Sequence, residues 1–277
     1  MLAIKKELIE LLNRNDLLRA SLVVGKIADA GFKIEPYVEI VLELSARVWH
    51  QAGRLRRDPV AQAKVINEVL FVENGLRGKS EKSKQVIDDP SRFYLHEVLD
   101  GKQASPLALS ILYSTVAEQI GLEHECIALP ANYFLKMKDV TGDFYVEPYD
   151  SGRFLTAEEF QKRFLSSVQK HRLMSTSLYE KISAAQLVGR LVQQLKHIYI
   201  LKGSALEALR AVELLTVLFP QSPELTRDRG ILYCEMEYFS KAIEDLKLYL
   251  KERPEADDVK EIKKLAGMLR GYREVVN

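Results

Sequence analysis

The feature that most constrains the fold of this chain is a spacing of 34 residues that recurs in its last third. Residues of the same type recur at this spacing: Tyr199 with Tyr233, Ala208 with Ala242, and Pro220 with Pro254. A small alanine lets two helices cross closely, and a proline ends the second helix of each copy. The spacing therefore predicts two antiparallel helix pairs, over Leu187–Pro220 and Gln221–Pro254.

A closing helix is predicted after the second pair, over Asp258–Tyr272, with Leu265, Leu269 and Tyr272 facing inward. The period of 34 residues is that of the tetratricopeptide repeat. Because two such repeats bury little apolar surface alone, we expect them to pack on the rest of the chain or on another molecule.

The N-terminal part, residues 4–71, carries apolar side chains at helical spacing and predicts three or four helices. Asp16 and Asp58 stand where N-caps are expected, and Pro36 and Pro59 fall in first turns. The polar stretch 79–90 has too few apolar residues for a core element, so we expect a mobile loop there.

The hydrophobic pattern changes at Gly121. Before it, Ser105 and Pro106 begin a long helix. After it, three short segments rich in β-branched and aromatic residues, 125–130, 133–139 and 143–149, predict a small antiparallel sheet. Thr156 and Glu159 then form a capping box that restarts a helix.

The predicted fold class is therefore α+β and mostly helical, with a small antiparallel sheet followed by a helical repeat array. The predicted domains are an N-terminal helical subdomain (1–71), an α+β core (72–182) and the repeats with their closing helix (183–277).

Composition excludes several functional classes. Lys and Arg number 40 against 39 Asp and Glu, so the net charge of +1 does not favour nucleic acid or an anionic membrane as a partner. No uncharged apolar run approaches the roughly 20 residues that cross a bilayer, and the lysine-rich and glutamate-rich start does not resemble a signal peptide.

The cysteines and histidines argue against a disulfide framework and a metal site. The two cysteines lie far apart, and the five histidines show no metal-binding spacing. We therefore expect no disulfide, no metal and no cofactor, and a reducing, cytoplasmic setting.

Three positions could carry chemistry. Ser105 opens a helix, which is where papain-like folds place a nucleophile, although serine there is usually only a cap. His124 and Cys126 would face the same side of one strand, although a free cysteine on a strand is usually a core residue. Glu147 and Asp150 form a carboxylate pair at a strand end, where acidic residues also gather simply because solvent is near.

Several segments together resemble the SirB-like family, in which a transglutaminase-like domain precedes tetratricopeptide repeats. They are VLFVENGLRGK at 69–79, the stretch from FYLHEVLDGK to AEQIGL at 93–122, ALPANYFLKM at 128–137, YVEPYDSGRFLTAEEF at 145–160 and LTRDRGILYCEMEYFSKAIEDLKLYL at 225–250. The resemblance implies a transglutaminase-like, papain-like core.

The same resemblance implies that the catalytic residues are missing. The superfamily uses cysteine, histidine and aspartate. The cysteine position falls at Ser105, the histidine position at Asn132 or Tyr133, and the aspartate position at Glu147. We therefore expect a degenerate cleft, lined by these four residues and Tyr149, that performs no acyl transfer.

The function expected from these observations is that of a non-catalytic interaction or regulatory module. The alternative is a residual hydrolase or acyl transferase that uses Ser105 or Cys126. We expect a protein or peptide partner on the repeats, contacted by Arg227, Arg229 and Lys241, with Tyr199 and Tyr233 in the core. The alternative for the repeats is that they only cover the α+β core.

Overall fold

The computed structural model describes residues 1–78, 89–129, 132–171 and 181–276, and it describes no side chain in 167–171 or 270–276. The described chain forms two compact units. We call Leu11–Leu191 the core unit, and Met1–Glu10 together with Val192–Asn277 the repeat unit. The domain boundaries expected near residues 71 and 182 stay predictions.

Helices fill the first part of the chain, as the spacing of apolar residues predicts. They are α1 (Leu2–Asn13), α2 (Leu17–Val23), η1 (Val24–Ile27), α3 (Glu35–Ala52), η2 (Gly53–Leu55), α4 (Pro59–Asn67), the π-helical turn η3 (Glu68–Glu73), η5 (Pro90–Arg92) and α5 (Leu95–Gly101). The predicted caps are confirmed, because Asp16 accepts a hydrogen bond from the Arg19 amide and Asp58 accepts from Val60 and Ala61. The loop predicted at 79–90 lies mostly outside the described residues.

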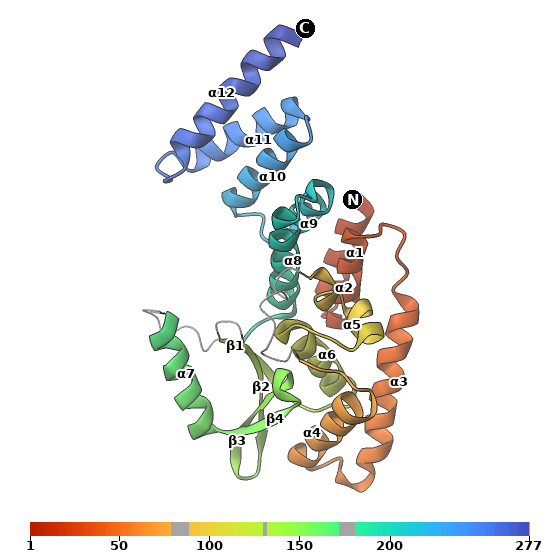
Figure 1. Ribbon diagram of the computed structural model, residues 1–277. Helices are drawn as coiled ribbons and strands as arrows, with labels where there is room; N and C mark the ends of the chain where they lie inside the picture. The colour runs from red at the N-terminus through yellow and green to blue at the C-terminus, as the bar shows by residue number, and fades with distance from the viewer. Residues whose placement is uncertain (79–88, 130–131, 172–180, 277) are drawn as a thin grey trace. The chain divides into compact units, whose positions relative to one another are not determined.

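The long helix predicted from Ser105 is α6 (Pro106–Gln119), and Ser105 caps it. Every side chain from Leu107 to Ala117 is buried. Such a helix must be covered on all sides. Helices α2, α3, α4 and α5 and the sheet pack around it (Figure 1).

The sheet has four antiparallel strands in chain order: β1 (Glu125–Leu129), β2 (Asn132–Asp139), β3 (Gly142–Glu147) and β4 (Arg153–Thr156). Three of these strands were predicted. The fourth, β4, follows the short helix η6 (Pro148–Asp150) through Ser151 and Gly152, which both have positive φ angles of 50° and 73°. The capping box of Thr156 and Glu159 then begins α7 (Ala157–His171), as predicted.

The two faces of the sheet are covered by different helices (Figure 1). Phe160 of α7 stacks on Tyr145 at 4.0 Å between ring centroids and meets Phe134 edge-on at 5.2 Å. These rings belong to one buried cluster with Ile127, Leu129 and Leu155. Helix α6 packs against β2 from the other side, where alternation along the strands places Cys126, Tyr133 and Leu135.

The last third of the chain contains the helix pairs that the 34-residue spacing predicts. They are α8 (Ala184–Leu201) with α9 (Ala205–Leu218) and α10 (Pro223–Glu235) with α11 (Phe239–Glu252), followed by α12 (Val259–Val276). The division between the two units falls inside α8 and inside α1. Ala208 and Ala242 are both fully buried, as residues at helix crossings should be.

The second repeat and α12 share one apolar core, formed by Ala242, Ile243, Leu246, Tyr249, Ile262, Ala266 and Leu269. Leu265 packs against it, and Leu269 is 4% exposed, so both face inward as predicted. The side chain of Tyr272 lies outside the described part of the chain. Tyr199 is buried and Tyr233 is half-buried.

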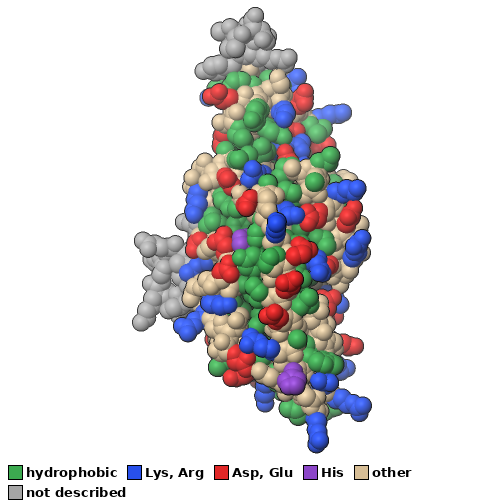
Figure 2. Space-filling view, turned by 90° about the vertical axis from the view of Figure 1, so that its right-hand side faces the viewer, with side chains coloured by type: hydrophobic (Ala, Val, Ile, Leu, Met, Phe, Trp, Pro, Cys, Tyr) green, Lys and Arg blue, Asp and Glu red, His purple; other side chains and the backbone are tan. Residues whose placement is uncertain are grey.

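Charges of both signs are interspersed on the face drawn in Figure 2, which agrees with a net charge of +1. No described helix combines the length and the apolar character that crossing a bilayer requires.

The contact between α7 and the sheet predicts a stability effect. Phe160→Ala removes a ring that is 1% exposed and packs on two others, so we expect a loss of about 3–5 kcal/mol in the free energy of unfolding. Leu165→Ala, at a half-exposed position of the same helix, should change it by less than about 0.5 kcal/mol. Urea unfolding followed by circular dichroism measures both, and equal effects would contradict this packing.

Candidate functional site

Ser105, which the resemblance predicts to lie near the superfamily's cysteine position, acts as a helix cap in this structure. Its Oγ accepts a hydrogen bond from the Ala108 amide at 3.2 Å, and its own amide donates to the Arg92 carbonyl at 2.9 Å. The side chain is 6% exposed. These contacts account for a serine followed by a proline at this point in the chain.

Asn132 and Tyr133, the two candidates for the superfamily's histidine position, begin β2, and successive residues of a strand face opposite sides of the sheet. Asn132 lies on the α7 face with Phe134, whereas Tyr133 lies on the α6 face. The guanidinium of Arg190 stands 5.9 Å from the centre of the Tyr133 ring. Neither side chain is a base near neutral pH.

Glu147, the predicted counterpart of the superfamily's aspartate, ends β3 and lies on the α7 face with Tyr145. It is 5% exposed and forms an ion pair with Arg163 of α7. Burial raises the pKa of the Glu147 carboxyl, and the attraction of Arg163 offsets this only in part. The Glu147 carboxylate therefore links the sheet to α7 rather than orienting an imidazole.

Tyr149 lies in η6, which packs against α6 and β2. A side-chain carbon at Gly78 would collide with the backbone of Tyr149, so this turn closely approaches residue 78. Ser105, Tyr133 and Tyr149 thus belong to elements that meet around α6, whereas Asn132 and Glu147 lie on the α7 face of the sheet. A single cleft lined by all five residues stays a prediction.

His124 and Cys126 were singled out as a pair, but the hydrogen-bond partner of the His124 ring is a serine. Its Nε2 lies 2.6 Å from Oγ of Ser114, on α6. Burial raises the pKa of the Cys126 thiol to about 11, and a hydrogen bond with Ser114 partly opposes this rise. Ser114 could not be predicted as a site residue, because a serine inside an apolar helix carries no signal of its own.

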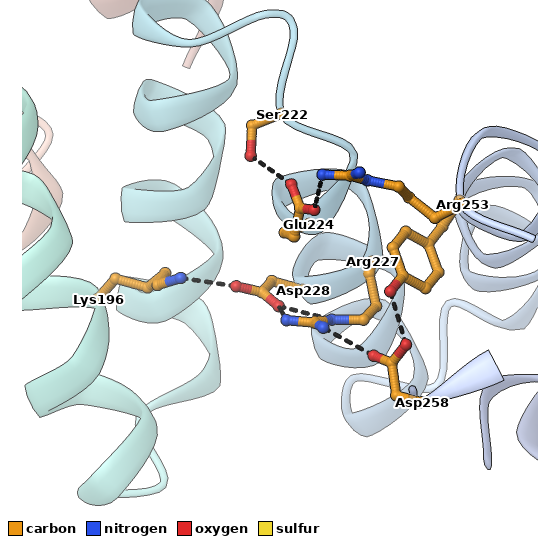
Figure 3. A network of polar contacts seen from close by, with 8 residues as sticks. Lys196, Ser222, Glu224, Arg227, Asp228, Arg253 and Asp258 are labelled. Atoms are coloured by element: carbon orange, nitrogen blue, oxygen red, sulfur yellow. Dashed lines mark hydrogen bonds and ion pairs between the residues drawn. The ribbon is translucent and has the colours of Figure 1, made fainter. Parts of the chain in front are cut away.

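In the repeat unit, Arg227 is held by other side chains of the same chain (Figure 3). Its guanidinium donates to Asp228 at 2.8 Å and to Asp258 at 2.7 Å. Asp228 also accepts from Lys196 of α8 at 2.6 Å, and Asp258 accepts from the Tyr249 hydroxyl at 2.6 Å. The network joins α8, α10, α11 and the residue before α12.

Arg229 is also held by a carboxylate of the same chain, whereas Lys241 is exposed. Arg229 forms two hydrogen bonds of 2.7 Å with the two carboxylate oxygens of Asp245, which is 8% exposed. Lys241 is exposed, and its Nζ lies 5.3 Å and 5.4 Å from the ring centres of Tyr233 and Tyr238. Of the three predicted partner contacts, Lys241 is the one whose charged group stands at the surface.

A metal site does not emerge from the described residues, since no three of their His, Cys, Asp and Glu side chains cluster as ligands would. Cys126 and Cys234 are both free thiols.

Comparison with known proteins agrees with this architecture. Residues 36–193 match the transglutaminase-like superfamily, and residues 195–267 match the tetratricopeptide repeat. No solved structure matches the chain.

Similar proteins come from bacteria and from mammals. A UPF0162 protein of Xylella fastidiosa is 25% identical over 70% of this chain and 69% of its own length. Protein SirB1 of Salmonella typhimurium is 26% identical over 58% of this chain and 60% of its own. F-box only protein 21 of Mus musculus is 24% identical over 61% of this chain, which covers 27% of that protein.

The buried Glu147 predicts a pH-dependent difference in stability. Between the pKa of the unfolded carboxyl and its raised pKa in the folded protein, the folded state binds more protons. Wild-type stability should therefore fall as pH rises through this window, and Glu147→Gln should remove that contribution. Urea unfolding at several pH values from about 4 to 7 gives the free energy of unfolding of both proteins. The wild-type value minus the Glu147→Gln value should decrease as the pH rises.

The control for this prediction is Glu158→Gln, at an exposed residue of α7 that pairs with Lys162. It should leave the pH dependence close to that of the wild type. A wild-type advantage over Glu147→Gln that grows with pH would mean that the pair with Arg163 outweighs burial.

Proposed function

The chain belongs to the transglutaminase-like superfamily, and on this premise we propose that its transglutaminase-like cleft is non-catalytic and that the chain acts as a regulatory, protein-binding module. Its tetratricopeptide repeats would hold a protein or peptide partner. One observation carries the non-catalytic part: the positions of the superfamily's cysteine, histidine and aspartate hold a helix cap, an amide or phenol, and a carboxylate engaged by Arg163. Acyl transfer of the superfamily's type requires a thiolate and a neighbouring base.

The alternative, a residual hydrolase that uses Ser105 or Cys126, has less support. Oγ of Ser105 already accepts the hydrogen bond that caps α6. The Cys126 thiol is buried, with a pKa of about 11, so almost none of it is thiolate at neutral pH.

The binding role is supported by an aromatic and basic patch on the second repeat, which we call the tyrosine–lysine patch: the half-buried Tyr233 and the exposed Tyr238 and Lys241. The two rings lie 6.2 Å apart and meet edge-on, and Tyr238 is 51% exposed. Tyrosine is enriched at protein interfaces because it offers apolar area and a polar end. Helix-pair repeats commonly bind peptides and proteins.

Arg227 and Arg229 are weaker candidates for partner contacts than Lys241. Their guanidinium groups are held by Asp258 and Asp245, so a partner would have to compete with ion pairs inside the repeat unit. The setting we propose is cytoplasmic, in keeping with two free thiols.

Partner binding is tested by reversing the charge of Lys241 in the full-length chain. Lys241→Glu places a carboxylate beside two tyrosine rings and should remove the partners that the wild-type protein captures from its own cell extract, identified by mass spectrometry. Lys247→Glu makes the same charge change at another exposed residue of α11 and should retain them. If all three proteins, equally folded by circular dichroism, capture the same set, the patch does not bind a partner.

The absence of cysteine chemistry is tested by alkylation. At pH 7.5 a thiol with a pKa of about 11 is roughly one part in 3,000 thiolate, so iodoacetamide should leave Cys126 unmodified until urea unfolds the chain. Peptide mass spectrometry gives its modification separately from that of Cys234. Rapid modification of Cys126 in the folded protein, slowed by His124→Gln, would instead favour a thiol–imidazole pair.

A further inference from the structure

A pocket of about 550 Å³ lies within the core unit, at the end of α6 opposite Ser105. Its wall includes Ser114 and Glu118 of α6, His124 and Cys126 at the start of β1, and Lys181. Ser114 follows Ser105 by nine residues, which places it about 13 Å along the helix and on its other side. A volume of this size suits a small organic ligand.

The His124 ring is oriented by the backbone. Its Nδ1 lies 2.9 Å from the Leu122 carbonyl oxygen, which can only accept a hydrogen bond, so Nδ1 carries the proton. In the neutral ring Nε2 is then an acceptor, and the Ser114 hydroxyl donates to it at 2.6 Å. Burial lowers the pKa of His124, which keeps the ring neutral near pH 7.

These contacts form a chain of nucleophile, base and orienting acceptor on the wall of a pocket. Ser114 suits the role of nucleophile because its hydroxyl donates directly to the ring nitrogen that would take its proton. Lys181 lies near enough for its charge to act on both His124 and Cys126. Among the described residues, the other charged groups on the wall are Glu118 and Glu123.

We propose that Ser114 is a nucleophile that takes an acyl group from a small carboxylic ester or thioester bound in this pocket, with His124 as its general base. The proposal concerns a second site and does not depend on the partner-binding function of the repeats.

The step balances with water as the second substrate. Oγ of Ser114 bonds to the carbonyl carbon while its proton moves to Nε2 of His124. The bond from that carbon to the leaving alcohol or thiol then breaks, and the imidazolium returns the proton to the leaving group. Water next cleaves the acyl–Oγ bond by the same route, which releases the acid and restores the hydroxyl. The positive charge of Lys181 stabilises the negative charge that develops on the carbonyl oxygen.

The test uses the full-length chain, a fluorophosphonate probe and p-nitrophenyl acetate. We expect the probe to label Ser114, located by peptide mass spectrometry, and ester hydrolysis to be lost in Ser114→Ala. His124→Gln should slow labelling by about 100-fold or more, as loss of a general base does. The wild-type labelling rate should rise with pH as His124 loses its proton and reach its plateau at a lower pH than an ordinary imidazole would give, because burial lowers the pKa of the ring.

The matched control is Ser110→Ala, one turn earlier on α6. Ser110 is 1% exposed and, among the described residues, its Oγ has no hydrogen-bond partner, so this variant should label and hydrolyse like the wild type. Absence of label from Ser114 in the wild type would overturn the proposal. So would a wild-type labelling rate that shows no plateau as the pH rises through the range in which an imidazole loses its proton, and this measurement needs no variant. Either result would leave the capture experiment with Lys241→Glu unaffected.

Discussion

The burial of α6 on every side is the constraint on which the core unit depends. Eleven consecutive residues from Leu107 to Ala117 are shielded from solvent, so the helix cannot rest on a single partner. Four helices and the sheet have to close around it, and its start has to be fixed, which Ser105 and Pro106 do. The same burial encloses the hydroxyls of Ser110, Ser114 and Thr115, and in the described chain the Oγ atoms of Ser110 and Thr115 find no hydrogen-bond partner. Ser114 differs from these two because a histidine from outside the helix reaches it.

Features set by neighbouring residues could be predicted from the sequence. The cap at Asp58, the capping box at Thr156 and the 34-residue repeat depend on spacings within one stretch of chain. Strand β4 was missed because its four residues are too few to show alternation, and the turn before it gives Ser151, which is not a glycine, a positive φ. The Ser114–His124 contact joins a helix to the segment before a strand, so only the packing of the two brings it about.

Charge balance within the repeat unit explains why two arginines expected at its surface are engaged inside it. Asp228 lies between Lys196 and Arg227, and Asp258 receives both Arg227 and Tyr249. Each of these buried or half-buried groups would be costly if its partner were absent, so the pairs favour one arrangement of the helices over others. The ion pair between Arg227 and Asp258 could not be predicted from the sequence, because the two residues lie 31 positions apart in the chain.

The repeat unit is assembled from two segments that are distant in the chain. Residues of α1 belong to it, and Lys5 pairs with Glu213 of α9 at 3.0 Å. Because a ribosome makes residues 1–10 before the core unit and residues from 192 onward after it, the core segment is complete while the repeat unit still lacks most of its chain. The first turns of α1 therefore have no repeat-unit helix to pack on until the whole core unit has been synthesised. The order of translation thus sets the order of assembly, with the core unit first and the repeats last.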